Sequence, residues 1–226
     1  MDSAAQPTWN NPMRITCLHT ASSNIRVFDA AAERLGIAPN VLQHEVRADL
    51  LAAAEQAGGL TVDIANATAS ALRLLSLEAD AVVLTCSTLG PVVDGLSPGA
   101  AILRTDQALA FAAAQAGGNI AVLCAVETTL EPTARLFQQA AQFTSASVDV
   151  QWVPGAWALF KAGDLDGYLA VIASAADCAY RDGASTVALA QASMSGAAAR
   201  VTAGPPPLTS PTAGLSAALQ TILKGR

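Results

Sequence analysis

Short runs of apolar residues alternate along this chain with longer stretches in which apolar residues recur every three or four positions. The short runs predict buried β-strands, and the longer stretches predict helices with one buried face. The expected strands are residues 14–19, 41–46, 81–85, 101–103, 120–125, 148–153 and 186–190. The expected helices are residues 24–35, 48–57, 60–77, 105–115, 131–142, 166–181 and 211–223. Strands that alternate with helices predict an α/β protein whose parallel sheets are covered on both faces.

The pattern of elements restarts near the middle of the chain. Each half begins with a strand, and about 70 residues later comes a strand that ends at a polar or reactive residue. This residue is Cys86 in the first half and Gln191 in the second. The shared spacing predicts two pseudo-symmetric lobes, each a parallel sheet flanked by helices. Ligands bind at the carboxyl ends of parallel strands, so we expect the active site in the cleft between the lobes. Residues 1–103 with the closing helix in 207–226 are expected to form the first lobe and residues 104–206 the second, with a hinge at residues 204–207.

Composition excludes several classes of protein. Hydrophobic residues make up 52% of the 226 residues and charged residues 13%, which excludes a disordered chain. The apolar runs are too short to span a bilayer. The net charge of −6 and the lack of Lys and Arg clusters argue against a nucleic-acid partner. Residues 1–12 are polar and lack the apolar core of a signal peptide, so we expect a cytoplasmic protein without membrane association.

The cysteines are widely spaced and form no CxxC pair, which predicts reduced thiols. Cys17, Cys124 and Cys178 lie within apolar patterns and are interpreted as packing residues. We expect no metal site, because the only histidines, His19 and His44, are not near a cysteine pair.

Cys86 has the most distinctive surroundings of any residue in the chain. It ends a buried strand, two hydroxyl residues follow it, and Gly-Pro at 90–91 opens the next turn, where proline suits the first position of a helix. Backbone N–H groups of residues 87–89 at such a helix start would bind a carboxylate and lower the pKa of a nearby thiol. Cys86 is therefore a candidate base or nucleophile, and the alternative interpretation is a small buried hydrophobe.

Residues 80–90, with the sequence DAVVLTCSTLG, resemble the first cysteine motif of the aspartate/glutamate/hydantoin racemase superfamily. Residues 119–123, 127–130 and 187–194 resemble the second-lobe strand of that superfamily, the threonine loop after it and its second catalytic strand. The resemblance implies a cofactor-independent isomerase of amino-acid metabolism that forms homo-oligomers. Two cysteines of such an enzyme exchange protons with the α-carbon of a small carboxylic acid, one on each face.

The resemblance gives Cys86 the acid/base role. The side chains expected to bind the substrate are hydroxyls and an amide near strand ends: Thr20, Ser22, Ser23, Ser87, Thr88, Thr128, Thr129, Gln191 and Ser193. Gln191 stands where the second cysteine is expected, and an amide neither donates nor accepts a proton usefully near neutral pH. His19 is the last residue of the first strand and is a candidate acid/base. The equal alternative is that His19 is only a polar residue at a strand end.

Four functions therefore stay open. The first is a racemase or isomerase with one cysteine, in which His19 or a substrate group supplies the missing proton. The second is a lyase for a malonate-like acid, because the superfamily includes arylmalonate decarboxylase, although its single cysteine lies in the second lobe. The third is cysteine addition to an activated double bond, as in maleate isomerases, which normally involves both cysteines. The fourth is a non-catalytic carboxylate-binding protein. No cofactor is expected, because the chain has neither a Gly-rich phosphate loop nor a lysine in a pyridoxal-type context.

Overall fold

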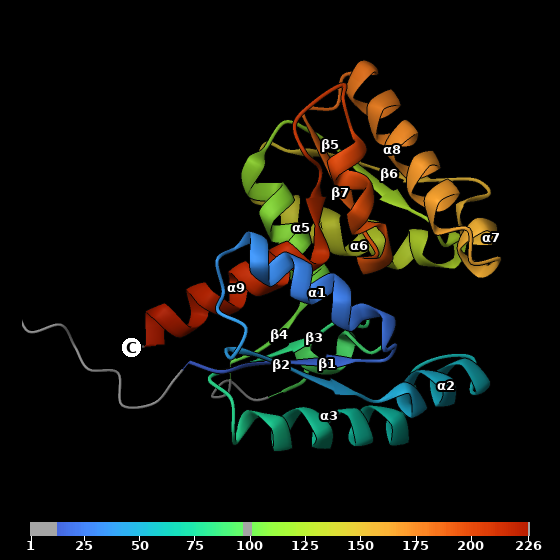
Figure 1. Cartoon of the computed structure of the whole chain (residues 1–226). Coiled ribbons are helices and arrows are strands. Elements are labelled where there is room, and N and C mark those ends of the chain that lie inside the picture. Colours follow the sequence, from blue (N-terminus) through green and yellow to red (C-terminus); the bar gives the residue numbers. More distant parts are fainter. Residues whose placement is uncertain (1–12, 97–100, 226) are drawn as a thin grey trace, which may run out of the picture.

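Two sheets form the framework of the protein (Figure 1). The computed structural model describes residues 13–96 and 101–225. One four-stranded sheet has the order β2-β1-β3-β4 and the other the order β6-β5-β7-β8, and every pair of neighbouring strands is parallel. The same order in both halves confirms the predicted fold of two parallel sheets flanked by helices. Residues 1–12, for which no signal peptide is predicted, and residues 97–100 of the predicted first lobe lie outside the described residues.

The elements of the two halves follow the predicted alternation. In the first half they are β1 (Ile15–His19), α1 (Ser23–Arg34), β2 (Leu42–Val46), α2 (Ala48–Gln56), α3 (Val62–Ser76), β3 (Ala81–Leu84), α4 (Pro91–Asp94), β4 (Ile102–Arg104) and α5 (Thr105–Ala116). In the second half they are β5 (Asn119–Cys124), the 3-10 helix η1 (Glu127–Thr129), α6 (Leu130–Ala141), β6 (Ser147–Trp152), α7 (Ala156–Lys161), α8 (Leu165–Arg181), β7 (Thr186–Leu189), the 3-10 helix η2 (Ala192–Arg200), β8 (Leu208–Thr209) and α9 (Ser210–Gly225).

The first sheet is buried on both faces, as its continuous apolar strands predict. Cys17 of β1 packs with Phe28 of α1 and Leu215 of α9 on one face. The next residue of β1, Leu18, packs with Leu72 of α3 on the other face, because successive side chains of a strand point to opposite sides. The last helix of the chain therefore returns to the first sheet, which is the closing role expected for it.

The second sheet is covered in the same way. Leu123 of β5 packs with Ile172 of α8 and Met194 of η2 on one face. Val122 packs with Phe137 of α6 on the opposite face, where α5 also contributes. No helix within the part of the chain that the structure describes is long and apolar enough to cross a membrane.

Four short elements of the described residues were not predicted from the sequence. They are α7, η2, β8 and the 3-10 helix η1, which lies in the expected threonine loop. The shortest, β8, has two residues and so no periodicity to detect. Because β8 pairs with β7, the chain stays in the second sheet through Thr209, and α9 begins at Ser210. The sequence predicts that the chain returns to the first lobe at residue 207, and the pairing of β8 instead places this return at Ser210. The division into lobes remains our proposal.

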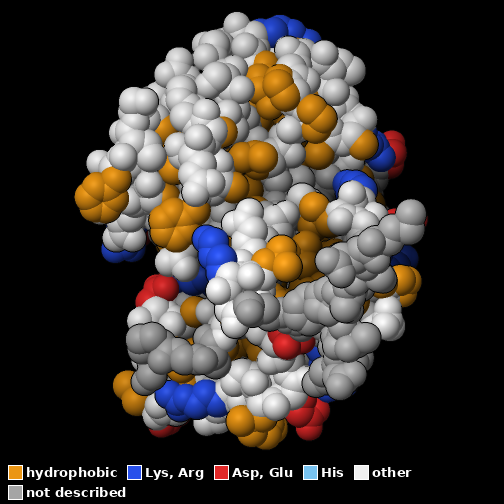
Figure 2. Space-filling view, turned by 90° about the vertical axis from the view of Figure 1, so that its left-hand side faces the viewer, with side chains coloured by type: hydrophobic (Ala, Val, Ile, Leu, Met, Phe, Trp, Pro, Cys, Tyr) orange, Lys and Arg blue, Asp and Glu red, His pale blue; other side chains and the backbone are white. Residues whose placement is uncertain are grey.

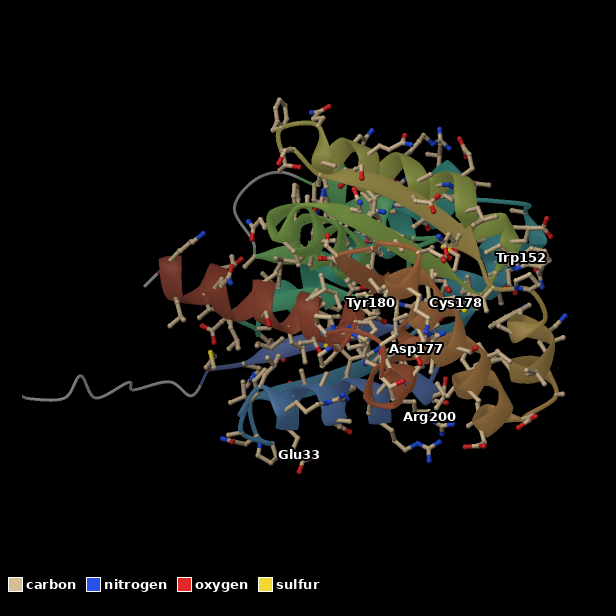
Figure 3. All side chains as sticks on the ribbon, turned by 90° about the horizontal axis from the view of Figure 1, so that it is seen from above. Glu33, Trp152, Asp177, Cys178, Tyr180 and Arg200 are labelled. Atoms are coloured by element: carbon tan, nitrogen blue, oxygen red, sulfur yellow. The ribbon has the colours of Figure 1, made fainter. Side chains whose placement is uncertain are left out.

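The segment after η2 is held against α8 (Figure 3). The carboxylate of Asp177 accepts hydrogen bonds from the backbone N–H of Thr202 at 2.8 Å and from its hydroxyl at 3.0 Å. The hydroxyl of Tyr180 donates to the carbonyl of Pro205 at 2.8 Å. These bonds anchor the predicted hinge at residues 204–207 to the second lobe.

Candidate functional site

Cys86 lies just beyond the carboxyl end of β3, where the sequence predicts it. The backbone N–H of Thr85 donates to the carbonyl of Leu18 at 3.1 Å, which ties the ends of β1 and β3 together. The Cys86 side chain is partly buried, whereas Cys17 and Cys124 are buried and Cys178 is exposed. Cys86 is thus a cysteine of intermediate burial just after a strand end, and its side chain packs against the core cluster that contains Leu84 and Leu89.

The turn after Cys86 exposes two hydroxyl side chains. Ser87 and Thr88 are exposed, and the fully buried Leu89 anchors the turn in the core. Within residues 13–96 and 101–225, no backbone carbonyl accepts a hydrogen bond from the N–H of Ser87 or Thr88. Helix α4 begins at Pro91, as predicted, but it has only four residues. Its dipole is therefore small, and any carboxylate here would depend on the free N–H groups and hydroxyls of the turn.

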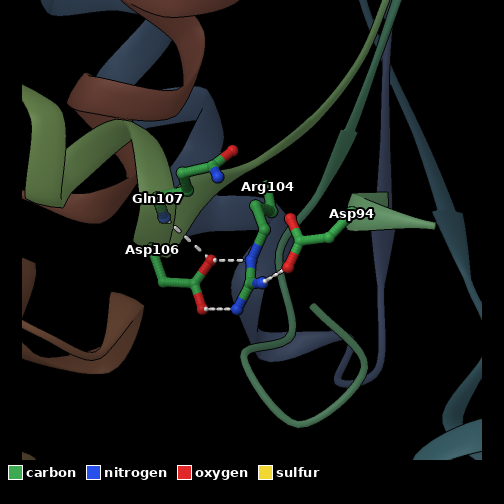
Figure 4. Close-up of polar contacts among 4 residues, drawn as sticks. All are labelled: Asp94, Arg104, Asp106 and Gln107. Carbon is green, nitrogen blue, oxygen red and sulfur yellow. Dashed lines mark hydrogen bonds and ion pairs between the residues drawn. The ribbon is translucent and has the colours of Figure 1, made fainter. Parts of the chain in front are cut away.

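A buried guanidinium lies beneath this turn (Figure 4). Nε and Nη2 of Arg104 donate to the two carboxylate oxygens of Asp106 at 2.8 and 2.7 Å, and Nη1 donates to Asp94 at 2.7 Å. Burial by itself would lower the pKa of Arg104, but the hydrogen bonds and charges of the two aspartates raise the pKa above its ordinary value. A Cβ atom at Gly90 would lie 2.5 Å from Nη2 of Arg104, so only glycine allows this close approach.

Arg104 therefore joins the end of β4 to α4 and to the start of α5. Sequence analysis missed it, because a single arginine after a short strand carries no periodic signal. The glycine of the Cys86 motif was the available clue, since it permits close contact with another group.

His19 is fully buried, and both of its ring nitrogens are hydrogen bonded. Nδ1 lies 2.9 Å from Oγ1 of Thr85, and Nε2 lies 2.8 Å from Nδ1 of His44. The ring of Phe28 packs edge-on against it at a centroid distance of 5.1 Å. Burial, and then the neighbouring His44, lower the pKa of His19 to about 4. The histidine predicted as an acid/base thus lies next to the Cys86 strand but inside the core.

The hydroxyl residues after β1 differ in exposure. Thr20 is buried, while Ser22 and Ser23 at the start of α1 are exposed. Ser22 occupies the N-cap position, yet its hydroxyl makes no capping hydrogen bond. The two serines are therefore open to a ligand, whereas the buried Thr20 is not.

Gln191 has a well-defined structural role in the second lobe. Its Oε1 accepts a hydrogen bond from the backbone N–H of Ala125 at 2.8 Å, and its Nε2 donates to Oγ1 of Thr129 at 3.1 Å. The hydroxyl of Thr129 in turn donates to the carbonyl of Val126 at 2.6 Å. Gln191 thus connects the carboxyl ends of β7 and β5, and both of its amide atoms are engaged.

We expect Gln191→Ala to destabilise the protein by about 1–3 kcal/mol, because the buried N–H of Ala125 would lose its acceptor. Gln191→Glu keeps an acceptor for Ala125 and loses only the donation to Thr129, so its effect should be smaller. Urea unfolding of both variants measures this order. Equal stability of Gln191→Ala and wild type would contradict the anchoring role.

The remaining predicted residues of the second lobe lie in different surroundings. Thr128 is exposed in η1. Oγ of Ser193 lies 2.8 Å from the hydroxyl of the buried Tyr168, so Ser193 faces α8. Burial raises the pKa of the Cys124 thiol, although hydrogen bonds from Thr133, Thr129 and Gln191 oppose this. A packing role for Cys124 fits this setting.

The structure brings the predicted residues together in two groups. At the joined ends of β1 and β3, His19 contacts Thr85 on one face of the sheet, whereas Cys86 packs on the other face against the cluster that contains Leu84. At the joined ends of β5 and β7, Gln191 contacts Thr129. Ala192, which follows Gln191, packs against the first-lobe core that contains Cys17 and Phe28. The carboxyl end of β7 therefore meets the first lobe directly.

A large hollow of the surface lies elsewhere. Figure 2 views the side of the molecule that is at the left in Figure 1, and hydrophobic side chains gather across the middle of this face. A hollow of about 630 Å³ runs between α5, α9 and the ends of β4 and β8. Its lining includes Ile102, Phe111, Leu208, Thr212 and Lys224, and it includes none of the predicted site residues.

Comparison with known proteins decides the family. The family model described as Asp/Glu/Hydantoin racemase matches residues 61–218, which is more than half of the chain. The chain belongs to the Asp/Glu/hydantoin racemase family. The matched segment of this racemase-family chain contains Cys86 and Gln191, and it begins after β1, α1 and β2.

Solved structures share the fold at low sequence identity. Aspartate racemase from Picrophilus torridus is 12% identical, with a TM-score of 0.69 over 94% of each chain. Allantoin racemase from Pseudomonas fluorescens is 18% identical, with a TM-score of 0.62 over 94% of this chain and 92% of that one. Glutamate racemase isoform RacE1 from Bacillus anthracis is 14% identical, with a TM-score of 0.60 over 94% of this chain and 82% of that one. No curated protein matches the sequence. At these identities the likeness establishes the fold, and the chemistry must be argued from the site.

Proposed function

We propose that this racemase-family protein moves a proton at the α-carbon of a small carboxylic acid, with the Cys86 thiol as acid/base and without an organic cofactor. The observation that carries the proposal is the partly buried Cys86 thiol at the carboxyl end of β3, within the segment that matches the family. The solved relatives named as aspartate, allantoin and glutamate racemases support an isomerase that acts on a small molecule of this kind.

The turn after Cys86 is suited to hold the substrate carboxylate. The exposed hydroxyls of Ser87 and Thr88 and their free backbone N–H groups are hydrogen-bond donors. The same donors would stabilise the negative charge that develops when the thiolate removes the α-proton. We place Ser22 and Ser23, exposed after β1, and Thr128, exposed after β5, as further binding residues.

The chemistry proposed for Cys86 is one-sided. Both amide atoms of Gln191 are used within the second lobe, and an amide does not transfer protons near neutral pH. His19 is buried with both nitrogens engaged, so we give it no contact with substrate. The proton that Cys86 removes therefore returns from Cys86 itself or from a group of the substrate.

The same observation favours a second candidate function. A site with one thiol suits a decarboxylase of a malonate-like acid, in which loss of carbon dioxide leaves a carbanion that Cys86 protonates from one face. Gln191, as a neutral hydrogen-bonding anchor in place of a second thiol, is the feature that supports this lyase.

Proton exchange in deuterium oxide tests the proposal and separates its two forms. The wild-type protein is incubated with both enantiomers of aspartate and glutamate, a hydantoin, maleate, and aryl- and alkylmalonates, and the α-proton signal is followed by NMR. Exchange with retention of configuration supports a one-sided site, and release of carbon dioxide supports the lyase. Racemisation would rule out return of the proton from Cys86 alone; it would require a second acid, either a group of the substrate or a residue other than those we assign. If no compound exchanges or reacts and a thiol-reactive probe also fails to label Cys86 before the other three cysteines, the non-catalytic carboxylate-binding function takes the place of both.

The predicted homo-oligomer and the cytoplasmic location stay predictions from the sequence. Size-exclusion chromatography with light scattering determines the first.

A further inference from the structure

Cys17, His19 and His44 gather beneath helix α1, outside the proposed site. Within residues 13–96 and 101–225, they are the one group of three or more metal-binding side chains whose ligand atoms are close together, all within 4.8 Å of one another. Cys17 of β1 lies opposite His44 of β2 in the parallel register, and His19 is two residues further along the same face of β1. Strand pairing therefore aims one sulfur and two imidazoles at a common point.

The outer nitrogen of each imidazole is held by an acceptor. Nε2 of His44 donates to the carboxylate of Asp29 at 3.0 Å. The hydroxyl of Thr85 donates to the carbonyl of Leu18 at 3.1 Å, so its oxygen is free to accept from Nδ1 of His19 at 2.9 Å. Metal-binding histidines have this arrangement, because an outer acceptor fixes the ring orientation and leaves the inner nitrogen with its lone pair.

The two inner nitrogens then face each other. Nε2 of His19 and Nδ1 of His44 are 2.8 Å apart, so one proton is shared between them in a hydrogen bond. Cys17 and His19 of this cluster are fully buried. A metal ion in place of the shared proton would use both lone pairs at once.

We propose that Cys17 Sγ, His19 Nε2 and His44 Nδ1 bind a divalent transition-metal ion, with Zn²⁺ as the best fit to one thiolate and two imidazoles. Tetrahedral zinc with bonds of about 2.0–2.1 Å to nitrogen would widen the 2.8 Å separation by about half an ångström, and any ligand separation near 4.8 Å would have to shorten by about 1 Å. The side chain of His44 is 14% exposed and β2 is an edge strand. The metal ion would therefore enter from the side of β2, and the His44 side chain has room to move as it binds. Three protein ligands leave one position of the metal for water.

The charges agree with this assignment. A divalent ion bound by one thiolate and two neutral imidazoles has a net charge of about +1, and the carboxylate of Asp29 balances it through His44. Zinc is not expected from the sequence, because His19 and His44 are not near a cysteine pair along the chain. The register of β1 and β2 is what brings Cys17 to His44. The cluster precedes residue 61, where the family match begins, so the match does not bear on it.

Metal titration of the full-length protein tests the site without any substrate. After treatment with a chelator, wild type is expected to bind a single Zn²⁺ per chain in competition with a chromophoric chelator. With Co²⁺ in its place, a charge-transfer band from the thiolate is expected. Cys17→Ser should remove the band, and Cys17→Ser and His44→Gln should each weaken Zn²⁺ binding by about 100-fold or more. Asp29→Asn should weaken it by about 10–100-fold, as loss of an outer partner does.

Two matched cysteine variants are the controls. Cys178→Ser removes an exposed thiol, and Cys86→Ala removes the proposed acid/base, and both should bind Zn²⁺ as tightly as wild type. Circular dichroism establishes that each variant is folded, and His44→Gln, at the partly exposed edge, provides the test if Cys17→Ser does not fold. Absence of Zn²⁺ binding, a cobalt spectrum without a thiolate band, or unchanged affinity in Cys17→Ser and His44→Gln would overturn the site and leave the function proposed for Cys86 untouched.

Discussion

Replacing Cys86 by alanine is expected to lower kcat/KM for the substrate found in the exchange assay by about 10²–10⁴-fold, the usual contribution of a general acid/base. The thiol lies at the carboxyl end of β3, and Ser87 and Thr88, which we propose to bind the carboxylate, are unchanged in the variant. The loss should therefore appear mainly in kcat. Steady-state kinetics of Cys86→Ala and wild type measure it.

Cys178→Ser is the matched control, because Cys178 is an exposed cysteine on α8 (Figure 3) and should not affect kcat. In that background a thiol-reactive probe should label Cys86 before the buried Cys17 and Cys124. Full activity of Cys86→Ala, or no preference of the probe for Cys86, would rule out the proposed acid/base.

Arg104→Ala is expected to destabilise the protein by about 3–5 kcal/mol. The Arg104 side chain is 8% exposed and Asp106 is 16% exposed, so the substitution leaves a largely buried carboxylate without its cation. Asp94 is 51% exposed, and Asp94→Asn should cost less than about 1 kcal/mol because water screens that pair. Chemical denaturation of the three proteins measures the difference.

Arg104→Lys separates charge from geometry. Lysine keeps the positive charge but cannot form the two parallel hydrogen bonds to Asp106, so we expect an intermediate loss of stability. If Arg104→Ala costs no more than Asp94→Asn, the guanidinium does not hold the turn that carries Cys86.

Local patterns predicted the framework well. The apolar runs and the helical spacing placed β1, β3, β5 and β7 and the long helices to within a few residues of their observed ends. The repeated spacing predicted two parallel sheets, and the structure has them with the same strand order. The elements that escaped prediction, η1, α7, η2 and β8, are short or irregular, so that pairing and packing rather than sequence periodicity determine them.

Some features of the candidate site could likewise be predicted from local sequence, and others could not. Cys86 at a strand end, the hydroxyl-rich turn and Pro91 at a helix start are local features, and the sequence alone determined them. Only the tertiary structure decided that Gln191 is an anchor for Ala125, that His19 is buried against His44, and that Arg104 lies under Gly90. These contacts join residues from 14 to 66 positions apart, and sheet register and lobe packing, which no local pattern encodes, bring them together.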